Sequence, residues 1–380
     1  MQINVKLQKK DIIIISLVVL GLIATIIISS LLGRDGGTNI PNTPDTPDAP
    51  NSPEVTKQSY KIYDFSLFDT ITTIIGFEAT QDEFAQVSQH LIKELSEYHK
   101  LFDIYNEYKG INNIYTINQL HNGEHQVVKV DRRIIDMLLY AKEMYEITDG
   151  KTNVAMGSVL SIWHDYRTAG AETPSKAELP PMELLVEAAK HIDINDVIIN
   201  EEDCTVYLAD PAMTLDVGAI AKGYAVEMVA RMLESEGKTG YALNVGGNIR
   251  TIGVRADGKP WKTGIENPDD TSSYVEYIEI GDLAVVTSGS YQRYYVVGGK
   301  RYHHIIDVET LMPANKGFAS VSLICTSSAD GDALSTALFC MTAEEGIAFV
   351  NSYEGVEALW IMNDGSLLYS NNYKDYLSAR

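Results

Sequence analysis

The first feature of the chain is a long apolar run near its beginning. Residues 12–32 carry no charged side chain over 21 positions. As a helix rising about 1.5 Å per residue, the run would extend about 31 Å, which matches the hydrocarbon core of a bilayer. Because Lys6, Lys9 and Lys10 precede it, residues 1–11 are predicted to be cytoplasmic and the rest extracytoplasmic. A cleaved signal peptide is the alternative, although no small-residue cleavage site follows.

A proline-rich segment separates this run from the remainder of the chain. Within residues 33–58, proline recurs at every third position among Asn, Thr, Asp and Ser, at Pro41, Pro44, Pro47, Pro50 and Pro53. That period favours an extended polyproline II conformation, which would reach on the order of 75 Å at about 3.1 Å per residue. The sequence therefore predicts a spacer that holds one domain, residues 59–380, away from the membrane.

Apolar positions in residues 59–380 follow two periods. A helical period predicts helices at 82–103, 132–148, 182–189, 219–236 and 332–341. Alternation predicts a strand in 60–80, a short pair of strands in 197–208, and a series at 241–244, 249–254, 261–266, 274–280, 284–287, 294–297, 320–325 and 356–362. Because the strands cluster together, we expect an α+β fold: a single compact domain with mixed or antiparallel sheets and flanking helices.

Charge and cysteine content exclude some kinds of partner and site. The chain has 30 Lys and Arg against 52 Asp and Glu, a net charge of −22. This acidity argues against nucleic acid as a partner, because phosphate binding needs a basic surface. Cys204, Cys325 and Cys340 have no metal-binding spacing, and we expect them to be buried side chains rather than a disulfide framework.

One glycine-containing segment joins a strand end to a helix. It reads Leu-Asp-Val-Gly-Ala-Ile-Ala-Lys-Gly over residues 215–223. Its glycines allow the backbone to approach a ligand, and a helix N-terminus attracts anions. Asp216 and Lys222 place opposite charges on either side of the turn. An ordinary strand-to-helix turn is the alternative.

Two further segments carry polar side chains suited to catalysis. Asp332 and Thr336 are four residues apart on a predicted helix and so share one face. Their oxygens suit Mg²⁺, while capping of the helix by Asp332 is the alternative. His303 and His304 lie at a predicted strand end. They should point to opposite faces, so that only one acts as a general base.

Taken in order, these motifs resemble a known family. Residues 215–223, Asn-Val-Gly-Gly-Asn at 244–248, Thr-Ser-Gly at 287–289, Tyr-His-His-Ile-Ile-Asp at 302–307 and Asp-Ala-Leu-Ser-Thr at 332–336 match motifs of the ApbE family, the FAD:protein FMN transferases. Residues 108–118 and 157–163 match two further segments near the front of the domain.

The resemblance implies roles for individual residues. The metal ligands of the family correspond to the backbone carbonyl of Ala219 and the side chains of Asp332 and Thr336 in this sequence. Its flavin-contacting pair corresponds to Asp216 and Lys222, and its catalytic histidine to His304, with Lys222 also stabilising phosphate charge. Further contacts to FAD are expected from Tyr108, Lys151, Thr152 and Asn153.

The implied activity is Mg²⁺-dependent transfer of FMN from FAD to a Thr or Ser hydroxyl of a partner protein, with release of AMP. With the predicted anchor, this gives a single-pass protein of the cell membrane whose catalytic domain serves exported flavoprotein domains. Two alternatives remain open: an FAD pyrophosphatase that uses water as the acceptor, and a non-catalytic flavin-binding protein.

Overall fold

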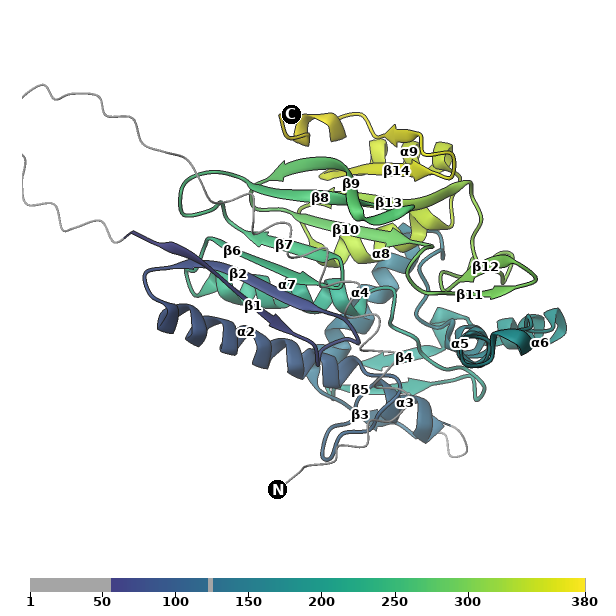
Figure 1. The fold of residues 1–380 in the computed structure, drawn as a ribbon. Coiled ribbons are helices and arrows are strands. Elements are labelled where there is room, and N and C mark those ends of the chain that lie inside the picture. Colours follow the sequence, from purple (N-terminus) through teal and green to yellow (C-terminus); the bar gives the residue numbers. More distant parts are fainter. Residues whose placement is uncertain (1–55, 122–125, 380) are drawn as a thin grey trace, which may run out of the picture.

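An eight-stranded antiparallel sheet forms the centre of the fold (Figure 1). The structure, a computed structural model, describes residues 56–121 and 126–379. The strand order is β1-β2-β6-β7-β10-β13-β14-β15. These strands are β1 (Gln58–Asp64), β2 (Thr72–Glu78), β6 (Tyr241–Val245), β7 (Asn248–Ile252), β10 (Ala284–Gly289), β13 (Phe318–Cys325), β14 (Val356–Met362) and β15 (Leu367–Tyr369).

Helices cover one face of this sheet and a hairpin covers the other. Three of the helices are α2 (Gln81–Phe102), α7 (Ala221–Ser235) and α8 (Ser328–Phe339), whose buried side chains form the main core with the sheet. The opposite face packs against β8 (Trp261–Asn267) and β9 (Asp270–Ile280). Both faces of the central strands are therefore apolar, which explains their long hydrophobic runs.

Smaller elements surround these layers. A three-stranded sheet is formed by β3 (Val128–Lys129), β5 (Thr205–Leu208) and β4 (Val197–Asn200), and a separate hairpin by β11 (Tyr294–Val297) and β12 (Lys300–His303). The other helices are α3 (Ile114–His121), α4 (Arg132–Ile147), α5 (Gly157–Glu172), α6 (Met182–Ala188) and α9 (Ala343–Ser352). The hairpin lies beside α5 (Figure 1).

The predicted α+β class with antiparallel sheets is confirmed. Helices α3, α5 and α9 and strands β3, β12 and β15 were not predicted, and two of the predicted elements differ clearly from the structure. The single strand predicted in 60–80 is wrong, because the chain turns between β1 and β2, which pair antiparallel. Phe68 and Asp69 take left-handed φ angles of 54° and 50° in that turn. The apolar alternation continues through the turn, with Leu67 buried, so the pattern alone does not reveal it.

The second difference is the start of α8. It begins at Ser328, four residues before the predicted start at residue 332, and Ser327 caps it by accepting a hydrogen bond from the Asp330 N–H. Nearly all of α8 is buried, so no polar face marks its first turn. The prediction of buried cysteines is confirmed for Cys325 and Cys340, whereas Cys204 is half-buried with a φ of 51°.

The predicted anchor at 12–32 lies outside the described residues, as does most of the predicted linker at 33–58. None of the helices in residues 56–121 and 126–379 combines the length and the hydropathy that a membrane span requires. β1 begins at Gln58, one residue before the predicted start of the domain.

Candidate functional site

The N-terminus of α7 lies directly against α8. A Cβ atom at Gly223 would lie 2.3 Å from the Ser328 carbonyl oxygen and 2.4 Å from the Asp332 Cβ. Only glycine permits this approach. The glycine singled out in the sequence therefore serves helix packing, and it brings two of the motifs, 215–223 and 332–336, together.

Asp332 does not cap its own helix. It is the fifth residue of α8 and is 5% exposed. Its Oδ2 accepts a hydrogen bond of 2.8 Å from the Gly223 N–H, and its Oδ1 lies 3.5 Å from the Lys222 Nζ. The carboxylate thus occupies the positive N-terminal end of α7, where the helix dipole and a free backbone donor stabilise its charge.

The predicted metal ligands gather around this carboxylate. Because the Gly223 N–H is bonded to Asp332, the Ala219 carbonyl four residues earlier receives no hydrogen bond from the described residues. Thr336 lies one turn after Asp332 and donates to its backbone oxygen at 3.2 Å. One carboxylate, one hydroxyl and one carbonyl are hard oxygen donors that suit Mg²⁺, which retains water and takes substrate phosphates as further ligands.

This donor set differs from a protein-only metal cage. No group of three or more His, Cys, Asp or Glu side chains in residues 56–121 and 126–379 is placed to hold a metal ion. Mg²⁺ does not need such a group when a phosphorylated substrate completes its shell. The residues present therefore fit the predicted ion.

The backbone around Asp216 is held by a buried amide. Asn118 of α3 accepts from the Leu215 N–H at 2.8 Å and donates to the Leu215 carbonyl at 2.9 Å. The Asp216 Oδ1 accepts from the Gly218 N–H at 2.8 Å. Burial raises the pKa of the Asp216 carboxyl, while that N–H and the nearby His164, Arg167 and Lys222 act to lower it.

His304 follows β12 and is held by its backbone. Its N–H donates to the Arg293 carbonyl at 3.1 Å. Its Nδ1 is buried and has no hydrogen-bond partner in the described chain. Burial, with Arg293, Arg167, His303 and Lys222 nearby, lowers the pKa of His304 to about 3. The ring is therefore neutral at pH 7 and lies in a cationic site.

His303 is the structural member of the pair. Its Nε2 donates to the Ala314 carbonyl at 2.7 Å, and its Nδ1 accepts from the Ile305 N–H at 3.2 Å. The ring also meets Phe339 edge-on, with centroids 5.4 Å apart. The two histidines thus have different surroundings, although β12 ends at His303 and His304 lies just beyond the strand. Of the two, His304 keeps a ring nitrogen without a partner in the described chain.

Replacing His303 with Ala should destabilise the fold. The change leaves the Ala314 carbonyl and the Ile305 N–H without their partner and opens a cavity beside Phe339. We expect a loss of about 2–4 kcal/mol in the free energy of unfolding, measured by urea denaturation. His90, which is exposed and paired with Glu236, provides the control, since His90→Ala should change stability by less than about 0.5 kcal/mol. Equal effects of the two substitutions would contradict this assignment.

Several groups near His304 carry no motif and were missed in the sequence. Arg167 and His164 of α5 lie together, with the Arg167 Nη2 3.0 Å from the His164 Nδ1. Burial raises the pKa of Tyr105 to about 12, and Asp216 acts in the same direction while Arg167 and Arg293 oppose it. A helix over 157–172 would have placed His164 and Arg167 on one face, but its apolar pattern is weak.

Tyr105, rather than Tyr108, lies among these groups. The residue is 53% exposed, and the centre of its ring lies 5.1 Å from that of His164. The Tyr108 hydroxyl instead donates to the Asp103 Oδ2 at 2.8 Å and lies 3.3 Å from the His99 Nε2. The predicted contact of Tyr108 with FAD stays a prediction, and Tyr105 is a further aromatic side chain beside His164.

The stretch 151–153 is bonded within the protein. The Lys151 Nζ lies 2.9 Å from the Glu309 Oε1. The Thr152 hydroxyl donates to the Ala333 carbonyl at 2.7 Å, and the Asn153 amide donates to the Ile192 carbonyl at 2.9 Å. Thr152 and Asn153 are buried, so their side chains fix this stretch against α8 and its surroundings. Their predicted contact with FAD stays a prediction.

The remaining motifs hold neighbouring elements of the fold together. The Ser288 hydroxyl lies 2.9 Å from that of Ser335, which ties β10 to α8 next to Thr336. Gly246 and Gly247 form the two-residue turn between β6 and β7 with φ angles of 58° and 92°. A Cβ at Gly246 would lie 2.5 Å from the Thr70 Oγ1, so this glycine also allows a close approach.

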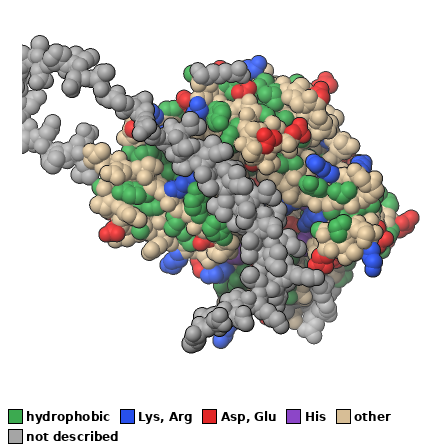
Figure 2. Space-filling model, in the orientation of Figure 1, with side chains coloured by type: hydrophobic (Ala, Val, Ile, Leu, Met, Phe, Trp, Pro, Cys, Tyr) green, Lys and Arg blue, Asp and Glu red, His purple; other side chains and the backbone are tan. Residues whose placement is uncertain are grey.

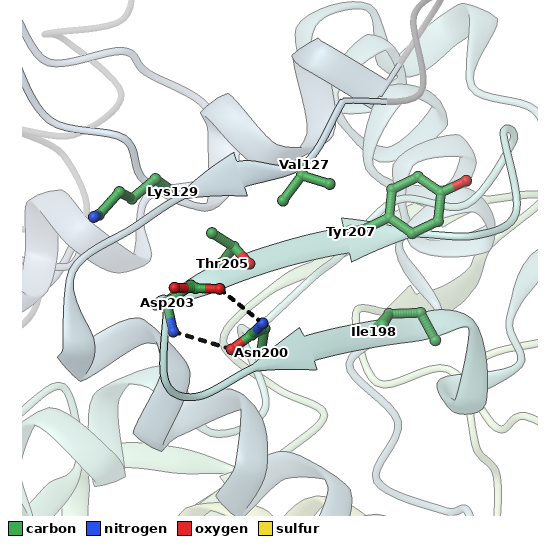
Figure 3. Close-up of a pocket in the computed structure, with 7 residues that line it drawn as sticks. All are labelled: Val127, Lys129, Ile198, Asn200, Asp203, Thr205 and Tyr207. Atoms are coloured by element: carbon green, nitrogen blue, oxygen red, sulfur yellow. Dashed lines mark hydrogen bonds between the residues drawn. The ribbon is translucent and has the colours of Figure 1, made fainter.

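A shallow hollow of about 430 Å³ lies elsewhere, over the three-stranded sheet (Figure 3). It is lined by Val127, Lys129, Ile198, Asn200, Asp203, Thr205 and Tyr207. Asp203 and Asn200 bond to each other at 3.0 and 3.1 Å. None of the predicted site residues lines this hollow, so we assign it no part in the chemistry.

Comparison with known proteins agrees with the motifs. The profile of the ApbE family matches residues 68–360. An FAD:protein FMN transferase of Klebsiella pneumoniae is 32% identical over 249 residues, covering 65% of this chain and 74% of the relative. One of Treponema pallidum is 33% identical over 251 residues, covering 62% of this chain and 67% of the relative.

Comparison with solved structures supports the same family. The crystal structure of the ApbE protein of Thermotoga maritima superimposes with a TM-score of 0.73 at 27% identity, over 85% of this chain and all of that one. The flavin transferase ApbE of Vibrio cholerae does so with a TM-score of 0.69 at 25% identity, over 84% of this chain and all of that one. With the family profile matched from Phe68 to Trp360 and the fold shared over 85% of its length, the chain belongs to the ApbE family.

Proposed function

We propose that this protein is a Mg²⁺-dependent FAD:protein FMN transferase acting on a Thr or Ser hydroxyl of exported acceptor proteins. The observation that carries the proposal is the position of His304. A neutral ring with an unbonded, buried Nδ1 lies among Lys222, Arg167 and Arg293. This is an arrangement for a base beside a bound polyanion.

The three cations would bind the pyrophosphate of FAD. They lower the pKa of His304 together with burial, so an anion that offsets their charge raises it again. Binding of FAD thereby brings the base closer to the range in which proton transfer is efficient. Tyr105 offers an exposed aromatic ring at the same place, suited to stacking on a planar group of the substrate.

The reaction can be written with its atoms balanced. The acceptor hydroxyl oxygen forms a bond to the phosphorus of the FMN half, and His304 takes the hydroxyl proton. The bond from that phosphorus to the bridging oxygen of the pyrophosphate breaks, and AMP leaves with this oxygen. Lys222 and the two arginines stabilise the charge that develops on the phosphate oxygens.

The Asp332 and Thr336 side chains and the Ala219 carbonyl would hold Mg²⁺. When bound, the ion neutralises phosphate charge and orients the substrate. The Asp332 carboxylate is kept in place for this by the Gly223 N–H. Lys222, 3.5 Å from the same carboxylate, can then contact a phosphate oxygen.

The proposal includes a location at the outer side of the cell membrane. The uncharged run at 12–32 and the proline-rich segment at 33–58 support a single-pass anchor with an extracytoplasmic catalytic domain. Protease treatment of intact cells should therefore remove the domain. Its survival under conditions that cleave a known surface protein would contradict this location.

The activity is tested by the mass of the acceptor. The full chain is incubated with FAD, Mg²⁺ and an exported flavoprotein domain, and the intact mass of that domain is measured together with free AMP and FMN. Transfer predicts a mass increase of one FMN less water and an equal amount of AMP. Equal release of free FMN and AMP with an unchanged acceptor would instead identify an FAD pyrophosphatase. A Thr-to-Val variant of the acceptor supplies the control.

A further inference from the structure

Helices α7 and α8 hold each other through a pair of carboxylates near their N-termini. The two helices pack against the same face of the central sheet (Figure 1). Asp332 of α8 accepts its hydrogen bond of 2.8 Å from the Gly223 N–H of α7. In the opposite direction, the Glu227 Oε2 of α7 accepts one of 2.9 Å from the N–H of Ser328, the first residue of α8.

These two hydrogen bonds, which we call the reciprocal clamp, follow one pattern. In each helix the donor precedes the carboxylate by four residues, as Gly223 precedes Glu227 and Ser328 precedes Asp332, so both lie on one face. The donors are N–H groups of a first helical turn, which have no acceptor within their own helix. Each carboxylate therefore satisfies a free donor at the positive end of the other helix.

The reciprocal clamp leaves little room for movement. Glu227 is 2% exposed and Ser328 is fully buried. Gly223 already approaches the Ser328 carbonyl as closely as a residue without a Cβ can. Because such a close-packed contact transmits displacement, any shift of the first turn of α8 would move Asp332 and Thr336 with it.

The two carboxylates of the clamp differ in their other partners. Asp332 lies 3.5 Å from the Lys222 Nζ. Glu227 is held by two arginines, with the Arg231 Nε 2.8 Å from its Oε1 and the Arg250 Nε 3.3 Å from its Oε2. The protein itself thus neutralises the charge of Glu227, whereas Asp332 is the carboxylate placed to meet a cation from outside.

Arg250 of β7 connects Glu227 to the sheet. Charged side chains are spread over the visible surface of the molecule (Figure 2), but Arg250 is only 5% exposed. It also pairs with Glu234 at 2.8 Å and with Asp282 at 2.6 Å. A buried guanidinium needs such compensation. This network fixes the Glu227 carboxylate relative to the central sheet.

We propose that Glu227 is a positioning residue for the metal site. Through the reciprocal clamp it holds Asp332 and Thr336 where Mg²⁺ would bind, with Arg250 as its support. This inference rests on the proposed function. Glu227 does not itself contact the ion, since the Ser328 N–H and two arginines occupy its buried carboxylate. Its loss should therefore act on the affinity for Mg²⁺ rather than on proton transfer by His304.

Hydrogen exchange tests the clamp in the full chain without metal. In the wild type, the peptides that contain Gly223 and Ser328 should exchange slowly at these two amides. Glu227→Met, which keeps about the same volume but removes the acceptor, should speed exchange of both amides at least about tenfold, because loss of one bond loosens the other. Glu227→Gln should keep exchange slow, since its amide oxygen can still accept from the Ser328 N–H.

The affinity for Mg²⁺ tests the positioning role. It is measured by isothermal titration calorimetry on the full chain saturated with FAD, without an acceptor protein. Glu227→Met should weaken Mg²⁺ binding at least about tenfold, and Glu227→Gln should restore most of the loss. At saturating Mg²⁺, kcat for FMN transfer by Glu227→Met should approach that of the wild type. If the single variant does not fold, Glu227→Met with Arg250→Met removes the buried cation as well and carries the same expectation.

Glu78→Met is the matched control. Glu78 is an equally buried carboxylate, 4% exposed, and it accepts from the Lys238 Nζ at 2.8 Å and from the Tyr241 hydroxyl at 2.7 Å. Both partners lie outside α7 and α8. Glu78→Met should therefore lower stability while leaving the affinity for Mg²⁺ and the exchange of Gly223 and Ser328 unchanged.

Equal losses of Mg²⁺ affinity in Glu78→Met and Glu227→Met, or no loss in Glu227→Met, would overturn the positioning role. Faster exchange of Ser328 alone would also overturn it, because Asp332 would then be held independently of Glu227. Coupled exchange of the two amides in a wild-type chain that binds no Mg²⁺ would keep the clamp and contradict the proposed metal site instead. The two failures are therefore distinguishable.

Discussion

Asp332→Ala should abolish Mg²⁺-dependent FMN transfer, with a loss of at least about 10³-fold in kcat. A metal ion is worth several kcal/mol in such reactions, and about 1.4 kcal/mol corresponds to a factor of ten. The same change removes the acceptor of the buried Gly223 N–H. We therefore also expect a loss of about 1–2 kcal/mol in the free energy of unfolding.

Asp332→Asn separates these two effects. An amide oxygen can still accept from the Gly223 N–H, so stability should be largely kept, whereas the loss of charge should still remove Mg²⁺-dependent activity. Asp330→Asn is the control on the same helix, because Asp330 bonds to the Tyr140 hydroxyl at 3.0 Å. Mg²⁺ titrations of activity, with urea denaturation in parallel, measure both. Normal activity of the Asn variant would refute the metal assignment. Thr336→Ala should weaken the affinity for Mg²⁺ less than either Asp332 variant does.

His304→Ala should slow transfer by about 10²–10⁴-fold while leaving FAD affinity largely unchanged. The ring supplies the proton acceptor, while Lys222, Arg167 and Arg293 remain to bind the phosphates. Rapid-mixing measurements of product formation give the rate of transfer, and fluorescence gives the affinity for FAD, so a loss of rate can be distinguished from a loss of affinity. His90→Ala should match the wild type. A variant that loses FAD affinity and rate together would assign His304 to binding instead.

The pH dependence gives a second readout for His304. Its pKa lies near 3 in the free protein, below the unfolded value of about 6.5. The folded state therefore binds fewer protons than the unfolded state between these values, so stability falls as the pH falls from about 6.5 towards 3. The Ala variant should lose less stability over this window. If bound FAD raises the pKa of His304, the acid limb of kcat should lie at higher pH than that of kcat/KM.

The sequence by itself determined the α+β class and the positions of most strands and of helices α2, α4, α6 and α7, and it supplied the candidate residues for the proposed chemistry. The helical or alternating period of apolar positions can be read from the sequence wherever an element has one buried and one exposed face, as in α2 and β9. The motifs at 215–223 and 332–336 supplied Lys222, Asp332 and Thr336. Strand alternation predicted different surroundings for His303 and His304, and the surroundings do differ, although β12 ends at His303.

The tertiary structure decided the relations between elements, because these depend on contacts between residues far apart in the chain. α8 is buried on nearly all sides, so its start and the true role of Asp332, which holds the N-terminus of α7, left no periodic signal. Arg167 and Arg293 reach His304 from separate elements, and no local pattern marks either. Packing of α5 against the β11–β12 hairpin brings them together.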